Sequence, residues 1–417
     1  MAFTYADMTE FMGRFGNDIM IEQVNEAGPL YERLPKINKG GRVGIVDVRG
    51  AFAAVQGIQD SGTLATGGAV TGVQGTYNPV ALLGRLAIPR LIHLADGEGE
   101  GIDLMEDQIK AVGSKLGRVR DCLLFSDSVH TVDATSEADF DGSAGAQTTI
   151  EMSDVAQIRV GDRLARYETS TAVVDEYLEV TAIDIDPDGI VHTVTVVRNA
   201  GPYGLTAGAS PTTAAVGDKV RFVGITGAYN FASLEAAAAA ADLYGITYTS
   251  NGWEATRQAA GGGDFDESEL NALFETVGVK RGQDPNLIVS HPRLRRFYGD
   301  ELVGQRRFMP GQKMDVGRTA KTGERDTDLE FQGQPWMVDP NCPMTLAYAL
   351  NTDDVAIRVF RDWLDEGDGG PTPHSANSIN LIPSGATFDY DAQIWGAFNL
   401  HWKRRNGLGL YSGVTTT

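Results

Sequence analysis

The chain has 417 residues, of which 42% are hydrophobic and 22% are charged, so it is neither a disordered nor a collagen-like sequence. Its length predicts roughly two or three lobes. A formal charge of −21 argues against general affinity for nucleic-acid backbones, because such binding needs a spread of Lys and Arg side chains. No run of about 18 consecutive apolar residues occurs, and the acidic N-terminus does not resemble a signal peptide. We therefore expect no membrane segment and maturation in a cytoplasm.

Residues 1–41 are expected to form an N-terminal arm. Apolar residues recur there at helical spacing and predict a short amphipathic helix: Met8, Phe11, Met12, Phe15 and Ile19. Residues 42–96 are expected to form an extended hairpin, since strand-like runs at 42–58 and 69–88 flank the polar, Gly-rich stretch QDSGTLATGG. Neither segment has enough large apolar side chains for a core of its own, so both should be stabilised by a partner.

The strongest helical pattern lies in residues 97–127. Apolar side chains there alternate spacings of three and four: Ile102, Met105, Ile109, Val112, Leu116, Val119 and Leu123. This predicts a helix of about six turns with one apolar stripe. The spacing is also compatible with a coiled coil, but Gly113 and Gly117 inside the helix favour one that lies on a sheet.

Residues 128–223 are rich in Val, Thr, Asp and Gly and predict an inserted small β-domain, either a barrel or a sandwich. A near-repeat, VGDRL at 160–164 and VGDKV at 216–220, suits two similar turns that lead into strands of this domain. The stretch DIDPDG at 184–189 begins like a calcium loop. However, Thr195 stands where a bidentate Glu is required, which favours a β-turn.

The following residues predict an α+β arrangement. In residues 224–280, Ser233 is placed to cap a helix through the alanine run 236–241, and Asp266 with Glu269 resembles a capping box. In residues 281–370, PNLIVSHPRLRRFY predicts a buried strand at Leu287–Val289, followed by a helix that starts at Pro292.

Residues 371–417 contain a long half-buried strand. From Phe388 to Trp402, apolar and small residues alternate with polar ones. The densest basic cluster of this acidic chain, Lys403 to Arg405, follows where the strand leaves the sheet and precedes an Asn-Gly turn. The cluster is better explained as an exposed strand terminus than as a nucleic-acid patch.

No catalytic or metal-binding motif is found. The histidines lack the i,i+4 pairing of a zinc helix, no P-loop pattern occurs, and DGSAG has Asp141 where a nucleophile elbow needs glycine. Cys122 and Cys342 lie in unlike contexts and are expected to be reduced, buried thiols. We therefore expect no cofactor, no metal and no enzymatic activity.

The order of these elements resembles the major capsid proteins of tailed bacteriophages, the Hong Kong 97-type fold. The stretches that carry the resemblance are GIQDSGTLATGGA at the hairpin tip, the helix from Ile102, PNLIVSHPRLRRFY, FQGQPWMVDPNCP with AYALNTDD, and the terminal WKRRNGLGLYSGV. The resemblance implies an α+β capsid fold with an N-terminal arm (1–41), an extended loop (42–96), the spine helix of a peripheral domain (97–127), a peripheral-to-axial segment (224–280), an axial domain (281–370) and a return to the peripheral domain (371–417). The β-domain at 128–223 is an insertion into that fold.

The resemblance also implies a function and partners. The chain would form hexamers and pentamers of an icosahedral shell, assembled in the host cytoplasm, that encloses double-stranded DNA without sequence-specific contact. Portal and scaffolding or decoration proteins would be further partners. The residues expected at subunit interfaces are Phe11, Phe15, Gln59, Asp60, Ser61, Thr63, Leu64 and Thr66. An encapsulin-like bacterial compartment and a cytoplasmic hydrolase with an accessory β-domain remain the alternatives.

Overall fold

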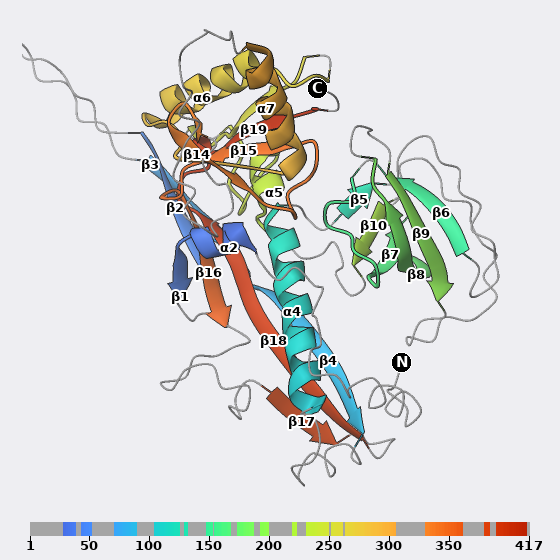
Figure 1. The fold of residues 1–417 in the computed structure, drawn as a ribbon. Helices are drawn as coiled ribbons and strands as arrows, with labels where there is room; N and C mark the ends of the chain where they lie inside the picture. Colours follow the sequence, from blue (N-terminus) through green and yellow to red (C-terminus); the bar gives the residue numbers. More distant parts are fainter. Residues whose placement is uncertain are drawn as a thin grey trace, which may run out of the picture.

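The structure is a computed structural model with three principal sheets and one long helix (Figure 1). It describes residues 28–38, 43–51, 71–89, 104–125, 129–131, 147–152, 154–167, 173–186, 192–199, 219–222, 231–249, 252–261, 263–305, 330–361, 379–383 and 389–414. Helices and strands are mixed, as predicted. None of the helices within these ranges is long and apolar enough to cross a membrane.

The largest structural element is a sheet built around one long strand, β18 (Asp389–Trp402). One edge of β18 pairs with β16 (Val355–Arg361) and β17 (Ile379–Pro383), and the opposite edge pairs with β4 (Val80–Pro89). The short β1 (Lys36–Asn38) extends the sheet in parallel beside β16. The strand predicted from Phe388 to Trp402 is therefore confirmed, but it is not half-buried throughout. Gly396 to Leu400 are buried in succession, and the buried amide of Asn399 is satisfied by Ala232 N and Asn78 O.

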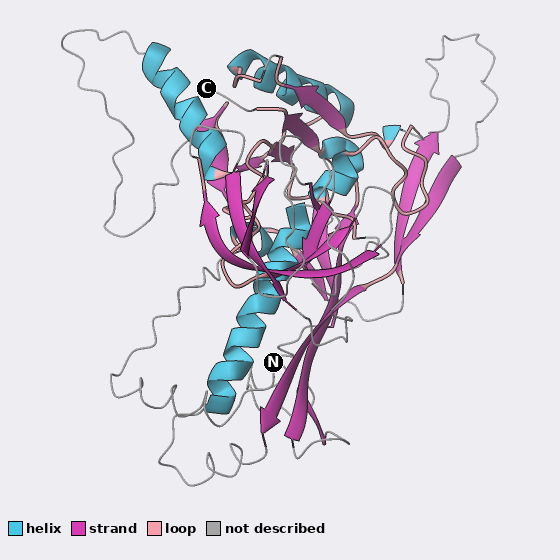
Figure 2. Ribbon diagram, turned by 90° about the vertical axis from the view of Figure 1, so that its right-hand side faces the viewer, coloured by secondary structure: helices cyan, strands magenta, loops and turns pink. Residues whose placement is uncertain are grey.

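The long helix α4 (Leu104–Phe125) lies along this sheet, and both views show it beside the long strands (Figure 2). The helix comes closest to β4 at Gly84, where a Cβ would lie within 2.5 Å of Val112 Cγ1 and 3.0 Å of Leu116 Cδ1. A glycine is thus needed for this packing distance. The helix predicted from the apolar stripe is confirmed, and it lies on a sheet rather than in a coiled coil.

A second, six-stranded sheet forms the lobe at the top of Figure 1. Its strands, in spatial order, are β11 (Thr256–Ala259), β19 (Gly409–Ser412), β15 (Ala347–Leu350), β12 (Leu287–Ser290), β14 (Gln334–Val338) and β13 (Glu330–Phe331). Helices α6 (Glu267–Arg281) and α7 (Pro292–Gln305) belong to this lobe. Strand β12, the start of α7 at Pro292 and the Asp266 cap of α6 are all as predicted.

A third sheet contains only residues from the predicted insertion. Its spatial order is β5 (Val129–Thr131), β10 (Lys219–Phe222), β7 (Arg163–Tyr167), β8 (Val173–Asp184), β9 (His192–Asn199) and β6 (Gln147–Met152). The first turn of the near-repeat leads into β7 through Gly161, whose φ is 87°. Residues 216–218 of the second turn lie outside the described residues, as do residues 187–191 of the possible calcium loop. The β10 strand that follows the second turn pairs with β7.

The return strand of the hairpin ends earlier than the sequence indicates, at Tyr77. Strand β2 (Gly44–Ala51) pairs with β3 (Thr71–Tyr77), and the tip between them lies outside the described residues. The predicted return arm is divided at Pro79, which has no N–H to continue the ladder. From Val80 onward the chain belongs to β4 and pairs with β18 instead.

Two short helices complete the described elements. Helix α2 (Pro29–Arg33) packs against α4, and α5 (Leu234–Ala238) starts at the predicted cap, where Ser233 Oγ accepts a hydrogen bond of 3.0 Å from Ala236 N. The alanine run does not stay helical to Ala241, because the chain leaves the helix at Ala239. A 3₁₀ turn, η2 (Arg405–Gly407), joins β18 to β19.

Candidate interaction surface

The residues that the sequence places at a subunit interface lie outside the described residues. They are Phe11, Phe15, Gln59, Asp60, Ser61, Thr63, Leu64 and Thr66. Their role stays a prediction. The structure does describe the root of the β2–β3 hairpin, whose tip contains most of them.

Tyr77 anchors this root to the large sheet. Its ring lies over Gly44 on the opposite strand, where a Cβ would come within 2.1 Å of Tyr77 Cζ, so a larger residue would clash. The Tyr77 hydroxyl shares a hydrogen bond of 2.8 Å with His401 Nδ1 on β18. Burial raises the pKa of Tyr77, against a smaller lowering by Arg358, so the hydroxyl keeps its proton at neutral pH.

A tight turn at residues 243–246 holds the hairpin from a second side. Tyr244 (φ 60°) and Gly245 (φ 78°) are both left-handed, as in a type I′ turn, although this backbone costs a tyrosine about 1–3 kcal/mol. The Tyr244 carbonyl accepts a hydrogen bond of 3.0 Å from Thr76 N on β3. The Tyr244 hydroxyl donates to Leu400 O at 2.6 Å, and the ring stands 4.7 Å from that of Tyr77. These contacts offset the strain and fix the direction in which the hairpin leaves the body.

Beyond its root, the hairpin presents apolar side chains to solvent. Val43 is 40% exposed, Ile45 51% and Val73 38%. In the described part of the chain, β2 and β3 pair only with each other, and an isolated two-stranded ribbon is marginally stable in water. Leu83 on β4 is 58% exposed as well, and it lies on the face away from α4. The ribbon and the neighbouring β4 thus expose apolar side chains at these described positions.

The basic cluster after β18 is divided between surface and core. Lys403 and Arg404 are exposed, but Arg405 is fully buried, so the expectation of an exposed cluster is wrong for Arg405. Its guanidinium donates hydrogen bonds to the carbonyls of the alanine run, one of them 2.8 Å long, and lies 4.8 Å from the Tyr248 ring. The carbonyl acceptors belong to Ala237, Ala239 and Ala241. Arg405 thus satisfies the backbone groups where α5 ends. Burial lowers its pKa to about 10.

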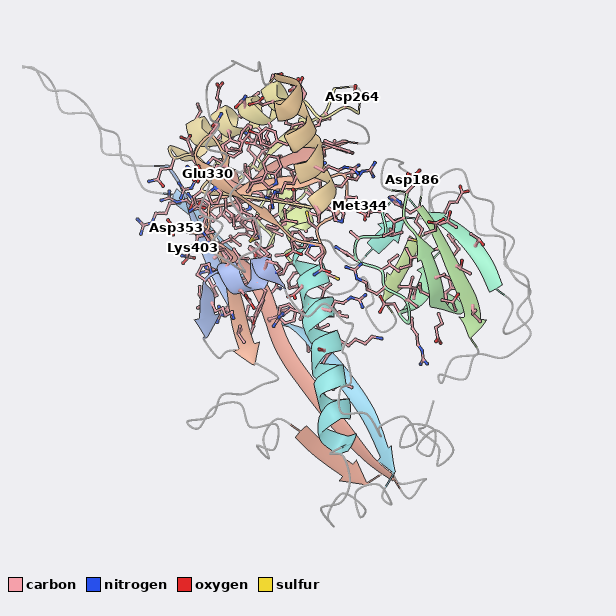
Figure 3. The ribbon with its side chains drawn as sticks, viewed as in Figure 1. Asp186, Asp264, Glu330, Met344, Asp353 and Lys403 are labelled. Carbon is pink, nitrogen blue, oxygen red and sulfur yellow. The ribbon has the colours of Figure 1, made fainter. Side chains whose placement is uncertain are left out.

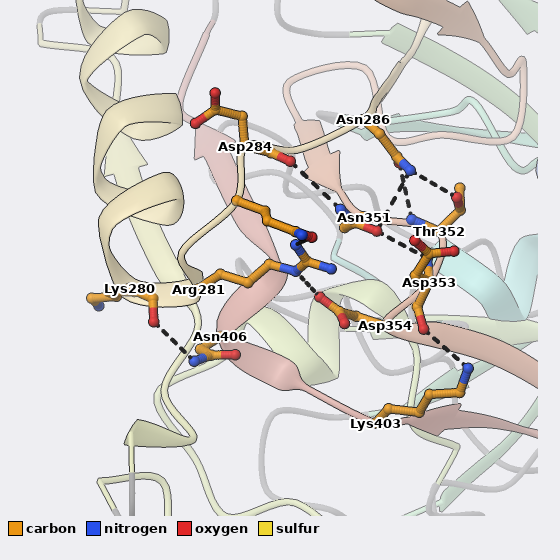
Figure 4. A network of polar contacts seen from close by, with 11 residues as sticks. Lys280, Arg281, Asp284, Asn286, Asn351, Thr352, Asp353, Asp354, Lys403 and Asn406 are labelled. Carbon is orange, nitrogen blue, oxygen red and sulfur yellow. Dashed lines mark hydrogen bonds and ion pairs between the residues drawn. The ribbon is translucent and has the colours of Figure 1, made fainter. Parts of the chain in front are cut away.

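A polar network joins the lobe to the large sheet close to this turn (Figure 4). Arg281 at the end of α6 forms a buried ion pair with Asp354 at the start of β16. Lys403 Nζ donates to Asp353 O at 3.0 Å, and Lys403 N donates to Asp354 O at 2.7 Å. The exposed cation is therefore used to fasten two parts of the same chain.

The inserted sheet is attached to the body through buried polar groups. Arg118 on α4 pairs with Asp162, and Gln157 donates to the carbonyls of Cys122 (3.4 Å) and Asn341 (3.0 Å). Asp154 accepts a hydrogen bond of 3.0 Å from the backbone N–H of Met344, which Figure 3 places on the side of the lobe that faces the inserted sheet. Burial raises the pKa of Asp154 to about 6. These contacts set the position of the sheet against α4 and the lobe.

Cys122 and Cys342 are free and buried, as expected. Burial raises the pKa of Cys122 to about 12, so its thiol is not an activated nucleophile. Within the described ranges, no group of three or more His, Cys, Asp or Glu side chains is placed to hold a metal ion.

Comparison with known proteins gives a likeness of fold. No family model matches the chain, and no curated protein matches it. Among solved structures, the chain is similar to the cyanophage A-1(L) capsid asymmetric unit, with a TM-score of 0.54 and 15% identity over 99% of this chain and 100% of that chain. The fold is that of a phage capsid protein.

Two further likenesses are weaker. The first is to the holo-SrpI encapsulin complex from Synechococcus elongatus PCC 7942, with a TM-score of 0.47 and 10% identity over 100% of this chain and 98% of that chain. The second is to Mycobacterium phage Bobi, with a TM-score of 0.44 and 13% identity over 99% of both chains. Both TM-scores are below 0.5, so neither likeness supports a conclusion about this chain.

Sequence reasoning missed the residues that hold the hairpin and the inserted sheet. Tyr77 and Tyr244 are single aromatics without a periodic neighbour, and their contact joins segments far apart in sequence. Gln157 and Asp162 lie shortly before β7, and no local pattern there indicates that their side chains are buried against α4 and the lobe. The one available signal was the near-repeat at 160–164, which marks the turn but not the partner Arg118.

Proposed function

We propose that this chain is the major capsid protein of a tailed bacteriophage, with a Hong Kong 97-type fold, and that it self-assembles into the icosahedral shell around the genome. The observation that carries the proposal is the capsid fold combined with a two-stranded ribbon that exposes Ile45 and Val73 and pairs with nothing else in the described residues. Such a ribbon gains stability when another copy of the chain covers it.

In this proposal the predicted segments take the roles that the resemblance implies. Residues 1–41 are the N-terminal arm, 42–96 the extended loop and 97–127 the spine helix. Residues 224–280 lead into the axial domain at 281–370, and 371–417 return to the peripheral domain. The inserted β-domain at 128–223 is an addition to the fold. Contacts between subunits involve the arm through Phe11 and Phe15, and the loop tip through a further set of residues: Gln59, Asp60, Ser61, Thr63, Leu64 and Thr66.

The chain would act as a container and not as an enzyme. Hexamers and pentamers close the shell, and packaged double-stranded DNA meets it without sequence-specific contact. The net charge of −21 supports this, because an acidic wall repels DNA and lets the polymer slide. Portal and scaffolding or decoration proteins complete the particle, which assembles in the host cytoplasm.

Negative-stain microscopy of the purified chain tests the proposal. We expect closed shells with wild-type protein, and folded subunits that assemble poorly when Gln59–Gly68 is deleted. A substitution of the same ten positions by a Gly-Ser linker separates loss of side chains from loss of length. A monodisperse monomer at high concentration would contradict shell formation, and normal shells from the deletion variant would show that the loop does not interlock subunits.

Substitutions on the described ribbon test the surface itself. Ile45→Asp and Val73→Asp are expected to lower assembly without unfolding the subunit, because both side chains are exposed. Val160→Asp, in the turn before β7, is the matched control, since Val160 is 63% exposed but lies outside the ribbon. Nuclease-protected DNA in shells recovered from a producing host distinguishes a phage capsid from an encapsulin, whose cargo would be protein.

A further inference from the structure

The first described stretch of the chain is a strap that lies against α4, the lobe and β16. It consists of residues 28–38: Gly28, helix α2 and strand β1. Leu30 of α2 and its C-cap residue Leu34 are buried, and β1 pairs with the edge of β16. The strap is therefore held to the body by burial of apolar side chains and by strand pairing.

A buried carboxylate on the lobe holds the strap by its backbone. Asp339 follows β14 and is 0% exposed. One carboxylate oxygen accepts a hydrogen bond of 3.3 Å from Leu30 N in α2, and the other accepts one of 2.9 Å from Asn341 N. Its neighbour Cys342 is a buried thiol whose pKa is raised, so it stays protonated and neutral and adds no charge beside Asp339.

A second buried carboxylate meets the strap from α4. Asp121 is 1% exposed, and its Oδ2 atom lies so close to Gly28 that a Cβ there would come within 1.9 Å. Arg120 Nε forms an ion pair of 3.1 Å with Asp121, while the Arg120 guanidinium also stands 3.2 Å from the centre of the Tyr31 ring on α2. The strap is thus enclosed between two carboxylates that come from different elements.

The surrounding charges do not neutralise both carboxylates. Asp121 interacts with the cations Arg120 and Lys36 and with the anion Glu32, and it repels Asp339. Burial raises the pKa of Asp339 to about 7 and that of Asp121 to about 6, against the opposing effects of their hydrogen bonds and of Arg120. Near neutral pH, the closed strap therefore holds two like charges in a poorly hydrated space.

We propose that the strap is a charge-controlled latch: ionisation of Asp121 and Asp339 loosens residues 28–38 from α4 and the lobe, and protonation tightens them. Opening of the strap hydrates both carboxylates and returns them to the acidity of an exposed aspartate. The latch is a property of the subunit and does not depend on the proposed shell function.

The direction and the pH window follow from linkage. A carboxylate whose pKa is higher in the closed state than in the open state disfavours closure as pH rises, until pH exceeds the closed-state pKa. Opening should therefore increase from about pH 4 to about pH 7 and then level off. With closed-state pKa values of about 6 and about 7, the opening constant should rise by up to about a hundredfold between pH 5.5 and 7.5.

Hydrogen–deuterium exchange of the full chain measures this opening directly. After division by the intrinsic exchange rate at each pH, amides of residues 28–38 should lose at least about fivefold protection between pH 5.5 and 7.5. Amides of β12 and β15 in the lobe core serve as the internal reference. Protection of the strap that changes less than this, or no more than that of β12 and β15, overturns the proposal.

Substitution of the carboxylates supplies the second test. Asp339→Asn keeps the shape and an acceptor oxygen but cannot ionise, so most of the pH dependence in residues 28–38 should vanish. If Asp339→Asn does not fold, Asp121→Asn is tested instead. It should remove a smaller part of the pH dependence, near pH 6. The exposed Asp353→Asn is the matched control and should retain the wild-type profile. A wild-type profile in both buried variants would refute the latch.

Discussion

Replacement of Arg405 by methionine should destabilise the subunit far more than the same change at its neighbour. Arg405 is 0% exposed, and its guanidinium is the donor for the carbonyls of Ala237, Ala239 and Ala241. Arg404 is exposed one residue earlier in the same turn. The pair therefore compares a buried arginine with a surface arginine at nearly the same place in the chain.

The size of the destabilisation depends on whether the three carbonyls find another hydrogen-bond donor once the guanidinium is removed. A buried acceptor left without its donor costs about 1–3 kcal/mol. Ala237 is fully buried and should incur that cost, whereas water can reach the carbonyls near the exposed Ala241 and reduce it. Methionine retains much of the side-chain volume. We therefore expect Arg405→Met to lower the free energy of unfolding by about 2–4 kcal/mol, and Arg404→Met by less than about 0.5 kcal/mol.

Equilibrium urea unfolding, followed by tryptophan fluorescence, measures both values. Trp402 is a nearby reporter, since it is buried and its Nε1 donates to Ala232 O at 3.1 Å. The free energy of unfolding of Arg405→Lys should lie between those of wild type and Arg405→Met, because an ammonium keeps the charge but lacks the planar guanidinium that donates to several carbonyls. Equal midpoints for Arg405→Met and Arg404→Met would refute the assignment of Arg405 as the group that satisfies the end of α5.

Three other predictions can be checked on the same protein. Gly84→Ala should lower the free energy of unfolding by about 1–3 kcal/mol, because the new methyl would come within 2.5 Å of Val112 on α4. Gly113→Ala has nothing within 4 Å of the new methyl, so it should raise the free energy of unfolding by about 0.5–1 kcal/mol in the same urea titration. Tyr77→Phe should cost about 1 kcal/mol through loss of the hydroxyl bond to β18, and exchange of the β3 amides should speed up accordingly. Some phage capsids weld neighbours through a loop lysine, but no lysine lies between Lys39 and Lys110, so boiled particles should give one band near 44.7 kDa in a denaturing gel, and a ladder that survives reduction would contradict this.

Regular elements were predictable where one period runs through many residues. The alternation from Phe388 to Trp402 predicts a strand, although both of its faces are buried at Gly396 to Leu400, and the three-four spacing from Ile102 to Leu123 predicts a helix with one apolar stripe. Those patterns depend only on neighbours along the chain. They identify β18 and α4, but not the strand that pairs with each edge of β18.

The failures occur where a distant partner decides the outcome. The strand-like run continues from β3 into β4, and Pro79 marks a break between them but does not indicate which strand Val80 pairs with next. Arg405 resembles its exposed neighbours in sequence, and the acceptors that allow its burial lie more than 160 positions away. The residues predicted at the loop tip stay untested, since they lie outside the described residues and their contacts would come from another chain.

The chain enters and leaves the inserted sheet through two neighbouring strands. Strands β5 and β10 carry the entry into it and the exit from it, and they are adjacent and antiparallel, with Val129 opposite Arg221. Neighbouring strands lie about 5 Å apart, so the backbone departs from the body and returns to it at almost the same point. A module with this geometry can be gained, lost or exchanged for a foreign domain by a single cut-and-join event, without rerouting the parent chain. Removal would leave Arg118 without Asp162 in a buried setting, so a viable excision would replace that arginine in the same step.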